Sequence, residues 1–211
     1  MTETAPPLRL KRVRMLLWIL VGIVLLAGLG LTLAQRPAKD MTPQAAANSS
    51  GKHGFGGPFI LVGADGKPFD SKALAGKAYA IFFGYTRCGD ICPTTLARLT
   101  KLRQQAGATD ALNIVFVTID PNNDGPKEVG QYAELFGTPI IGLTGTAAQI
   151  EAVKKQYGIF AEPDVDADGH MKMIDHTATV LLFDKNGNFA STLSPTDPDS
   201  AAIAKMKQLV A

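Results

Sequence analysis

The stretch from Tyr79 to Leu102, YAIFFGYTRCGDICPTTLARLTKL, limits the possible folds of this chain more than any other. Its first part, residues 79–83, is an apolar and aromatic run of strand length, and two cysteines and a proline follow it. Pro93 suits the first turn of a helix, where the amide hydrogen that proline lacks would have no partner. Three leucines then recur at near-helical spacing: Leu96, Leu99 and Leu102. The sequence therefore predicts a buried strand, a thiol loop and a helix, in that order.

The two cysteines in this stretch, Cys88 and Cys92, are the only ones in the 211-residue chain. The N–H groups and the positive dipole end at the start of a helix stabilise an anion, so a thiol held there loses its proton more readily than a free one. A disulfide between them would close a very short loop, and such strained bonds are easily reduced. This favours a redox-active pair, whose disulfide forms and breaks, rather than a permanent structural disulfide.

Strand-like and helix-like segments alternate beyond the thiol helix, which Gly107 should end. We expect strands at 113–119, 140–143, 177–183 and 189–193, and helices at 127–136, 146–157 and 201–210. Residues 59–69, with a turn at Asp65-Gly66, are expected to form a hairpin that opens the domain. This alternation predicts an α/β domain over residues 55–211, with a mostly parallel sheet that helices cover on both faces.

The segment at 15–34, MLLWILVGIVLLAGLGLTLA, has no charged side chain and is long enough for a helix across a hydrocarbon core about 30 Å thick. Basic residues precede it within residues 1–14, so the positive-inside rule places that end in the cytoplasm. A cleaved signal peptide is the alternative, since Thr32 and Ala34 are small residues suited to a cleavage site. Because the apolar run is longer than a usual signal segment, we expect a single-pass anchor in a bacterial inner membrane, with the following domain in the periplasm.

The charges are distributed unevenly between the N-terminal part and the rest of the chain. The formal net charge is +2, but residues 1–34 hold four basic groups against one acidic group, which leaves 17 basic and 18 acidic groups beyond them. A near-neutral domain lacks the clustered Lys and Arg of a nucleic-acid surface, so we exclude nucleic acid as a partner. Residues 35–54 are rich in Ala, Pro, Ser and Gly, which predicts a flexible linker.

The order of these elements resembles the thioredoxin fold, but the cysteine spacing differs from the CxxC of thioredoxin-like oxidoreductases. Three residues separate Cys88 from Cys92, and the added residue lets both sulfurs converge on a third body. Two thiolates select soft ions such as Cu(I), and an imidazole adds a ligand suited to Cu(I), Cu(II) or zinc. His176 is the candidate imidazole, because it lies near the place where thioredoxin-like proteins carry a cis-proline facing their cysteines. Asp175 beside it could orient the ring.

Four segments are similar to the Sco/SenC family of membrane-tethered copper proteins that help assemble cytochrome c oxidase. They are GYTRCGDICP at 84–93, VTIDPNNDGP at 117–126, GLTGT at 142–146 and IDHTATVLLFDKNG at 174–187. The resemblance covers the domain from about residue 55 onward. It implies that Cys88, Cys92 and His176 are copper ligands and that Asp120 is an acidic residue near the site. It also implies that the partners are the CuA-bearing subunit of the oxidase, other periplasmic copper chaperones and thiol reductants.

Two positions depart from the family pattern. The family usually has a proline after the first cysteine, where this chain has Gly89, and a tyrosine where this chain has Leu181. Gly89 should loosen the metal loop, which affects affinity and redox potential and leaves the identity of the ligands unchanged.

Two functions remain open for such a site. In the first, a copper metallochaperone holds copper and passes it to the CuA site of an oxidase subunit without turning over a substrate. In the second, an enzyme uses Cys88 and Cys92 as a dithiol that reduces the CuA-site cysteines through a mixed disulfide. A peroxide-reducing thiol enzyme is a weaker third hypothesis, since only the thiols themselves point to it.

An acidic run from Asp164 to Gly169, followed by Asp175, mimics the spacing of an EF-hand calcium loop. An EF-hand needs flanking helices and prefers glutamate at its last position, and Pro163 argues against a preceding helix. We therefore expect a solvated polar loop between a helix and the next strand, and no calcium site. Its mobility would let His176 approach or leave the thiols.

Overall fold

The computed structural model describes Trp18 and residues 55–165, 171–176 and 178–211. The chain divides into two units, residues 1–45 and 46–211, and in the first unit only Trp18 is described, as helical and exposed. No helix in the described ranges is long and apolar enough to cross a membrane. Apart from Trp18, the anchor expected at 15–34 lies outside those ranges, as do the N-terminal segment before it and the linker at 35–54.

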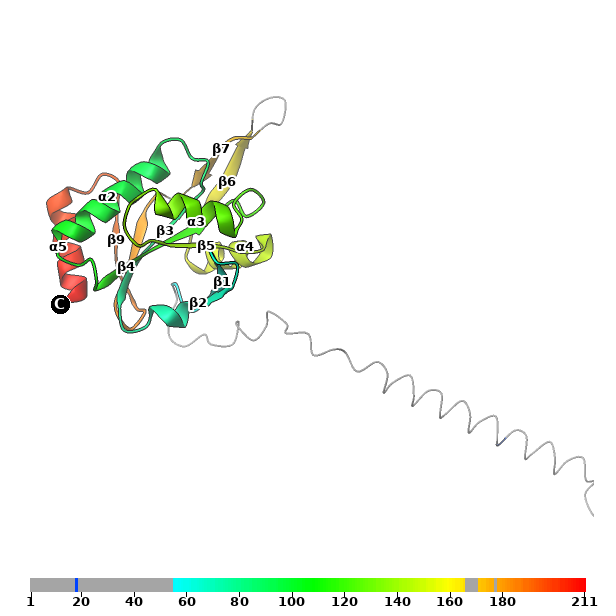
Figure 1. The fold of residues 1–211 in the computed structure, drawn as a ribbon, viewed down its shortest axis with the longest axis horizontal. Coiled ribbons are helices and arrows are strands. Elements are labelled where there is room, and N and C mark those ends of the chain that lie inside the picture. Colours follow the sequence, from blue (N-terminus) through cyan, green and yellow to red (C-terminus); the bar gives the residue numbers. More distant parts are fainter. Residues whose placement is uncertain (1–17, 19–54, 166–170, 177) are drawn as a thin grey trace, which may run out of the picture. The chain divides into compact units, whose positions relative to one another are not determined.

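A seven-stranded sheet in the order β2-β1-β5-β4-β3-β8-β9 forms the centre of the second unit (Figure 1). Its strands are β1 (Ile60–Gly63), β2 (Pro68–Asp70), β3 (Ala78–Gly84), β4 (Leu112–Thr118), β5 (Ile141–Thr144), β8 (Val180–Phe183) and β9 (Phe189–Leu193). Only the β3–β4 and β4–β5 pairs are parallel, and the other pairs are antiparallel. The prediction of a mostly parallel sheet is therefore wrong. Short turns join β1 to β2 and β8 to β9, and such turns allow only antiparallel pairing.

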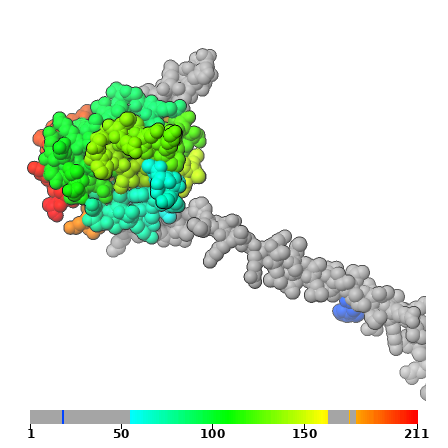
Figure 2. All heavy atoms as spheres, viewed as in Figure 1, coloured from blue at the N-terminus to red at the C-terminus, as the bar shows by residue number. Residues whose placement is uncertain are grey.

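Helices cover both faces of this sheet: α2 (Ile91–Gln105), α3 (Pro126–Glu134), α4 (Ala147–Gln156) and α5 (Asp199–Val210), with a 3-10 turn at Ser71–Leu74. Phe82 and Phe83 are neighbours on β3, so their side chains point to opposite faces. On one face Phe82 lies next to Phe116, whose ring centroid is 5.1 Å from that of Tyr132 on α3. On the other face Phe83 contacts Tyr157 at the end of α4, with ring centroids 5.7 Å apart. In Figure 2, the side chains of α2 and α3 cover the same face.

The thiol segment folds as the sequence predicted, with small shifts of its boundaries. All seven residues of β3 are buried, as expected of a strand covered on both faces. Helix α2 begins at Ile91, so Cys92 lies in its first turn and Cys88 in the loop before it. The helix ends at Gln105, and Gly107 follows with a φ of +66°, a conformation that glycine adopts without strain.

A second sheet of two strands, β6 (Ala161–Val165) and β7 (Met171–His176), was not expected. The strands pair antiparallel, with Ala161 opposite His176, and the hairpin projects beyond the edge of the larger sheet (Figure 1). The prediction of a solvated loop between a helix and a strand is therefore wrong for these residues. An apolar–polar–apolar alternation at 171–173 is a strand signal, which the acidic run before it obscured. The next strand, β8, consequently begins at Val180 and not at residue 177.

We expect Gly142→Ala to destabilise the domain, because Gly142 on β5 has α3 directly against its backbone. A Cβ atom added there would lie 2.6 Å from the carbonyl oxygen of Val129, so helix and strand would have to separate. Overpacking of this kind costs roughly 1–3 kcal/mol, which urea unfolding followed by circular dichroism can measure. Gly89→Ala is the matched control, since no heavy atom lies within 4 Å of a Cβ added there. Equal unfolding midpoints for the two variants would contradict the close packing of α3 on β5.

Candidate functional site at the thiol loop

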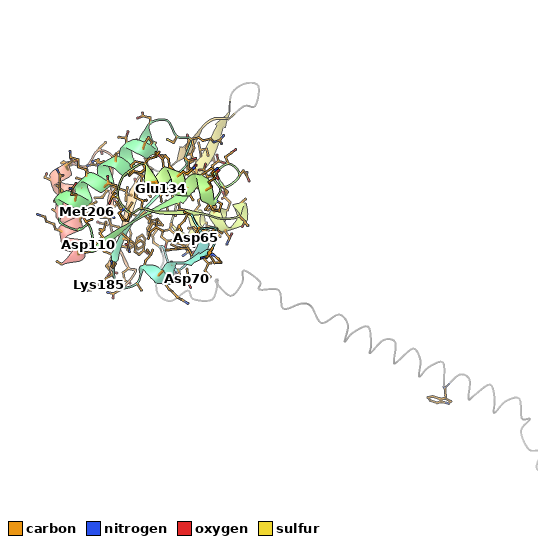
Figure 3. The ribbon with its side chains drawn as sticks, viewed as in Figure 1. Asp65, Asp70, Asp110, Glu134, Lys185 and Met206 are labelled. Carbon is orange, nitrogen blue, oxygen red and sulfur yellow. The ribbon has the colours of Figure 1, made fainter. Side chains whose placement is uncertain are left out.

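The thiol loop leaves β3 at the C-terminal ends of the parallel strands. Asp110 precedes β4, and Lys185 follows β8, which runs antiparallel to β3. Both residues therefore mark the N-terminal ends of the parallel strands, which lie away from the β6–β7 hairpin (Figure 3). Ligand sites of sheets with parallel strands lie outside the carboxyl ends of those strands. The fold therefore places both cysteines at the edge where a site is expected.

Cys88 and Cys92 are not joined by a disulfide, and both thiols are buried, with exposed fractions of 8% and 0%. The backbone N–H of Cys92 donates a hydrogen bond to the Cys88 sulfur, with nitrogen and sulfur 3.4 Å apart. Because Cys92 is in the first turn of α2, this N–H is one that the helix itself leaves without a partner. The start of the helix thus contacts the Cys88 sulfur, as the sequence pattern predicted.

The surroundings separate the acidities of the two thiols. Burial raises the pKa of Cys88, but hydrogen bonds from the amides of Asp90 and Cys92 and from the side chains of Cys92 and Tyr85 outweigh it. The pKa of Cys88 therefore lies below its ordinary value. Burial raises the pKa of Cys92 far above that value, and the neighbouring Cys88 raises it further. Cys88 is thus the more acidic thiol of the pair, a difference that the sequence left open.

Gly84, the last residue of β3, makes room for the second sulfur. A Cβ atom added at Gly84 would lie 2.8 Å from the Cys92 sulfur and 3.2 Å from the ring of Phe116. Any other residue would displace the sulfur or the aromatic ring that packs beneath it. The sequence analysis missed this residue, although a glycine that ends a buried strand just before a cysteine loop is a recognisable signal of close approach.

Asp124 is a second residue that the sequence analysis missed. Its carboxylate is fully buried and accepts hydrogen bonds from the Thr86 N–H at 2.9 Å, from the Thr86 hydroxyl at 2.6 Å and from the Thr118 hydroxyl at 2.6 Å. Thr86 lies two residues before Cys88, and Thr118 is the last residue of β4. Asp124 therefore fixes the thiol loop to the end of the neighbouring strand. The available signal was a second acidic residue in the short polar loop that follows a buried strand.

Asp120 lies beside the thiol loop, but cationic and amide groups already bind its carboxylate. It forms an ion pair with Arg87 at 2.6 Å and accepts hydrogen bonds from the Asn123 side-chain amide at 2.9 and 3.0 Å. Arg87 directly precedes Cys88 in the sequence. Asp120 thus contacts the thiol loop through Arg87, and a role for it beside a metal stays a prediction.

His176 is the last residue of β7, and its side chain and that of Asp175 lie outside the described part of the structure. What the structure does describe is the approach of their strand to the thiols. The N–H of Ile174 donates to the Tyr85 hydroxyl at 3.3 Å, and that hydroxyl also hydrogen-bonds the Cys88 sulfur. Among the described side chains no group of three or more His, Cys, Asp or Glu residues could hold a metal ion. The three-ligand set with His176 therefore stays a prediction.

The chemistry of the described donors fits a soft metal ion. Cys88 is predisposed to be a thiolate, Cys92 is within one helical turn of it, and β7 brings a histidine-bearing strand to the same loop. Thiolates are the ligands that Cu(I) and zinc prefer, whereas calcium and magnesium bind oxygen.

In the reduced protein we expect iodoacetamide to modify Cys88 well before Cys92, because Cys88 is the more exposed thiol and has the lower pKa. Peptide mass spectrometry after timed quenching measures both rates. In Cys92→Ser, which isolates Cys88, the rate should persist to lower pH than for free cysteine and fall once the pH drops through the depressed pKa. Faster modification of Cys92, with Cys88→Ser as its matched variant, would contradict this assignment.

Comparisons with known proteins place these features in a family. Residues 47–211 match the family SCO1/SenC. An SCO2-like protein of Rickettsia felis is 36% identical over 178 residues, which are 81% of this chain and 86% of that protein. Protein SCO2, mitochondrial, of Saccharomyces cerevisiae is 30% identical over 196 residues, which are 90% of this chain but 65% of the yeast protein. The chain thus spans about two thirds of the length of that relative.

Solved structures agree with the sequence relatives. The structure of Bradyrhizobium japonicum ScoI with copper bound has a TM-score of 0.66 and 35% identity, and the match covers 74% of this chain and 99% of that one. Yeast Sco1 with copper bound has a TM-score of 0.64 and 31% identity, with coverage of 73% and 87%. The chain therefore has the mixed α/β thioredoxin-like fold and belongs to the SCO1/SenC family.

Proposed function

We propose that this protein is a copper-binding assembly factor of cytochrome c oxidase that binds copper through Cys88, Cys92 and His176 and passes it to the CuA site of an oxidase subunit. One observation carries the proposal: the strand that ends at His176 meets the loop that holds two adjacent thiols not joined by a disulfide. The copper-bound structures of Bradyrhizobium japonicum ScoI and yeast Sco1, which this chain resembles, support copper as the cargo.

The described residues suit the binding and the release of a soft ion. Thiols must lose their protons to ligate a metal, so the lowered pKa of Cys88 favours its role as the first ligand. Cys92 must lose its proton when copper binds, which makes affinity fall as the pH falls. Asp124 and the Arg87–Asp120 pair hold the loop in place while the metal is exchanged. Oxidation of the thiols to a disulfide would remove two ligands at once.

The alternative, a thiol-disulfide reductase, is favoured by the difference in acidity between the two thiols. The Cys88 thiolate would attack a disulfide between the CuA-site cysteines, form a mixed disulfide and expel one partner thiolate. The Cys92 thiol would then lose its proton and attack the Cys88 sulfur, which releases the second partner thiol and leaves a Cys88–Cys92 disulfide. The partner gains two electrons. A periplasmic thiol reductant then supplies two further electrons, which reduce the Cys88–Cys92 disulfide back to the dithiol.

His176→Ala separates the two functions, because copper holding loses a ligand whereas thiol exchange needs only the two sulfurs and access to them. Loss of a group that only hydrogen-bonds and orients a metal ligand already lowers metal affinity on the order of 10–100-fold, so loss of a ligand should cost at least as much. We expect this loss in a competition titration with Cu(I), together with defective oxidase activity in a strain grown at low copper. The rate at which the purified protein reduces an oxidised CuA-site peptide should stay unchanged.

His170→Ala is the matched control, since His170 precedes His176 by six residues. It should leave copper affinity and oxidase activity unchanged. Normal oxidase assembly in a His176→Ala strain whose protein no longer binds copper would mean that the reductase function replaces copper delivery. Unaltered copper affinity in His176→Ala would remove this residue from the ligand set.

We also propose that residues 15–34 anchor the protein in a bacterial inner membrane, with the copper-binding domain in the periplasm. The basic cluster before the uncharged 20-residue segment supports this topology. Protease added to intact spheroplasts should then digest the domain and leave a cytoplasmic marker protein intact. A domain that survives until the inner membrane is permeabilised would reverse the topology, and its release in soluble form would indicate a cleaved signal peptide.

A further inference from the structure

Among the described residues, the β6–β7 hairpin has few attachments to the rest of the domain. Its two strands contact each other extensively, and no contact of comparable extent joins either strand to another element of the described structure. Figure 1 shows the hairpin projecting past the larger sheet. Each described bond between the hairpin and the body therefore has a large share in setting the position of the hairpin, and with it the position of the backbone at His176.

One such bond is the hydrogen bond from the Ile174 N–H to the Tyr85 hydroxyl, 3.3 Å long. Ile174 lies opposite Pro163 in the hairpin, and its N–H is directed away from β6, toward a side of β7 that no other strand of the described structure covers. Ile174 is 8% exposed, so this N–H has little access to water. A buried N–H without a partner is costly, and the Tyr85 hydroxyl supplies the acceptor that a neighbouring strand would otherwise provide.

The same hydroxyl hydrogen-bonds the Cys88 sulfur. A phenol has one donor hydrogen and two acceptor lone pairs, so it can accept from the Ile174 N–H and donate to the sulfur at the same time. Tyr85 directly follows β3 and is 7% exposed, so the surrounding core holds its ring. The hydroxyl therefore sits at a fixed point between the thiol loop and β7.

We propose that Tyr85 is a positioning residue whose hydroxyl joins the Cys88 sulfur to the Ile174 amide and so fixes the separation between the thiol loop and the strand that ends at His176. The role of Tyr85 in copper binding rests on the proposed function, because it requires His176 as a ligand. The bridge itself does not, because Tyr85, Cys88 and Ile174 form it without His176. Without the hydroxyl, the Ile174 N–H loses its hydrogen-bond acceptor. Water is the acceptor that can replace it, and β7 moves away from the thiols to let water reach the N–H.

Tyr85→Phe tests the bridge, because it keeps the buried ring and removes only the hydroxyl. Tyr157→Phe is the matched control: the Tyr157 hydroxyl is also held by the backbone, donating to the carbonyl oxygen of Gly57 at 2.6 Å, and Tyr157 is 1% exposed. The full chain is used in detergent, reduced and free of metal. Hydrogen exchange followed by mass spectrometry reports on the peptide 171–176, and alkylation across a pH series reports on Cys88.

We expect Tyr85→Phe to speed exchange in peptide 171–176 roughly 2- to 10-fold, the range that corresponds to the loss of one ordinary hydrogen bond. The midpoint of Cys88 alkylation should move to higher pH, since the thiolate loses a donor. In a separate titration, the dissociation constant for copper should rise by a similar factor and the sulfur-to-copper charge-transfer band should shift. Tyr157→Phe should change none of these, even if both variants lose similar thermal stability.

Unchanged exchange in peptide 171–176 would overturn the proposal, as would equal effects of Tyr157→Phe, which would reveal a general loosening of the domain. A change in the alkylation profile without a change in exchange would also overturn it, because Tyr85 would then act on Cys88 alone. The proposed function fails separately: if His176→Ala binds copper normally, the exchange readout without metal still decides whether Tyr85 joins the loop to β7.

Discussion

The buried carboxylate of Asp124 is the interaction on which the rest of the site depends. It accepts hydrogen bonds from the backbone N–H and hydroxyl of Thr86 and from the hydroxyl of Thr118. The backbone carbonyl oxygen of Asp124 accepts a further hydrogen bond from the hydroxyl of Thr144 on β5. A carboxylate can be buried only when donors of this kind replace its water, so the three segments must stay together. The thiol loop is thereby fixed to β4 and β5 immediately before Cys88. The geometry of the sulfurs follows from this attachment and from the start of α2.

The two cysteines share a loop but have different surroundings, and this difference suits both functions considered above. Cys88 receives amide and hydroxyl donors, whereas Cys92 packs against Gly84 at the end of the central strand. One sulfur is thus prepared to carry charge and the other to stay protonated until a metal or a disulfide bond compensates it. Gly89 lies between them with open space around it, so its contribution is backbone freedom within the loop. Leu181, the other departure from the family pattern, is a core residue of β8 that pairs with Ile81 on β3.

The antiparallel edges of the sheet show where reasoning from sequence reached its limit. Periodicity identified β3, β4, β5 and the helices between them to within a few residues, because each of these elements buries a regular apolar face. It could not decide that β8 pairs antiparallel with β3, because pairing direction is set by how distant segments meet and not by the pattern of either one. The β6–β7 hairpin was missed for a related reason. The acidic residues before its second strand have the composition of a solvated loop.

By itself, the sequence determined the thioredoxin-like arrangement of strand, thiol loop and helix, the family and the two cysteines of the site, because these depend on local spacing and on residue chemistry. Only the tertiary structure decided that Cys88 is the more acidic thiol, that Asp124 and Gly84 support the loop, and that Tyr85 joins it to β7. Those properties depend on burial and on hydrogen bonds between residues up to 89 positions apart in the chain. Such contacts leave no periodic trace in a single sequence, because only the folded chain brings their two partners together.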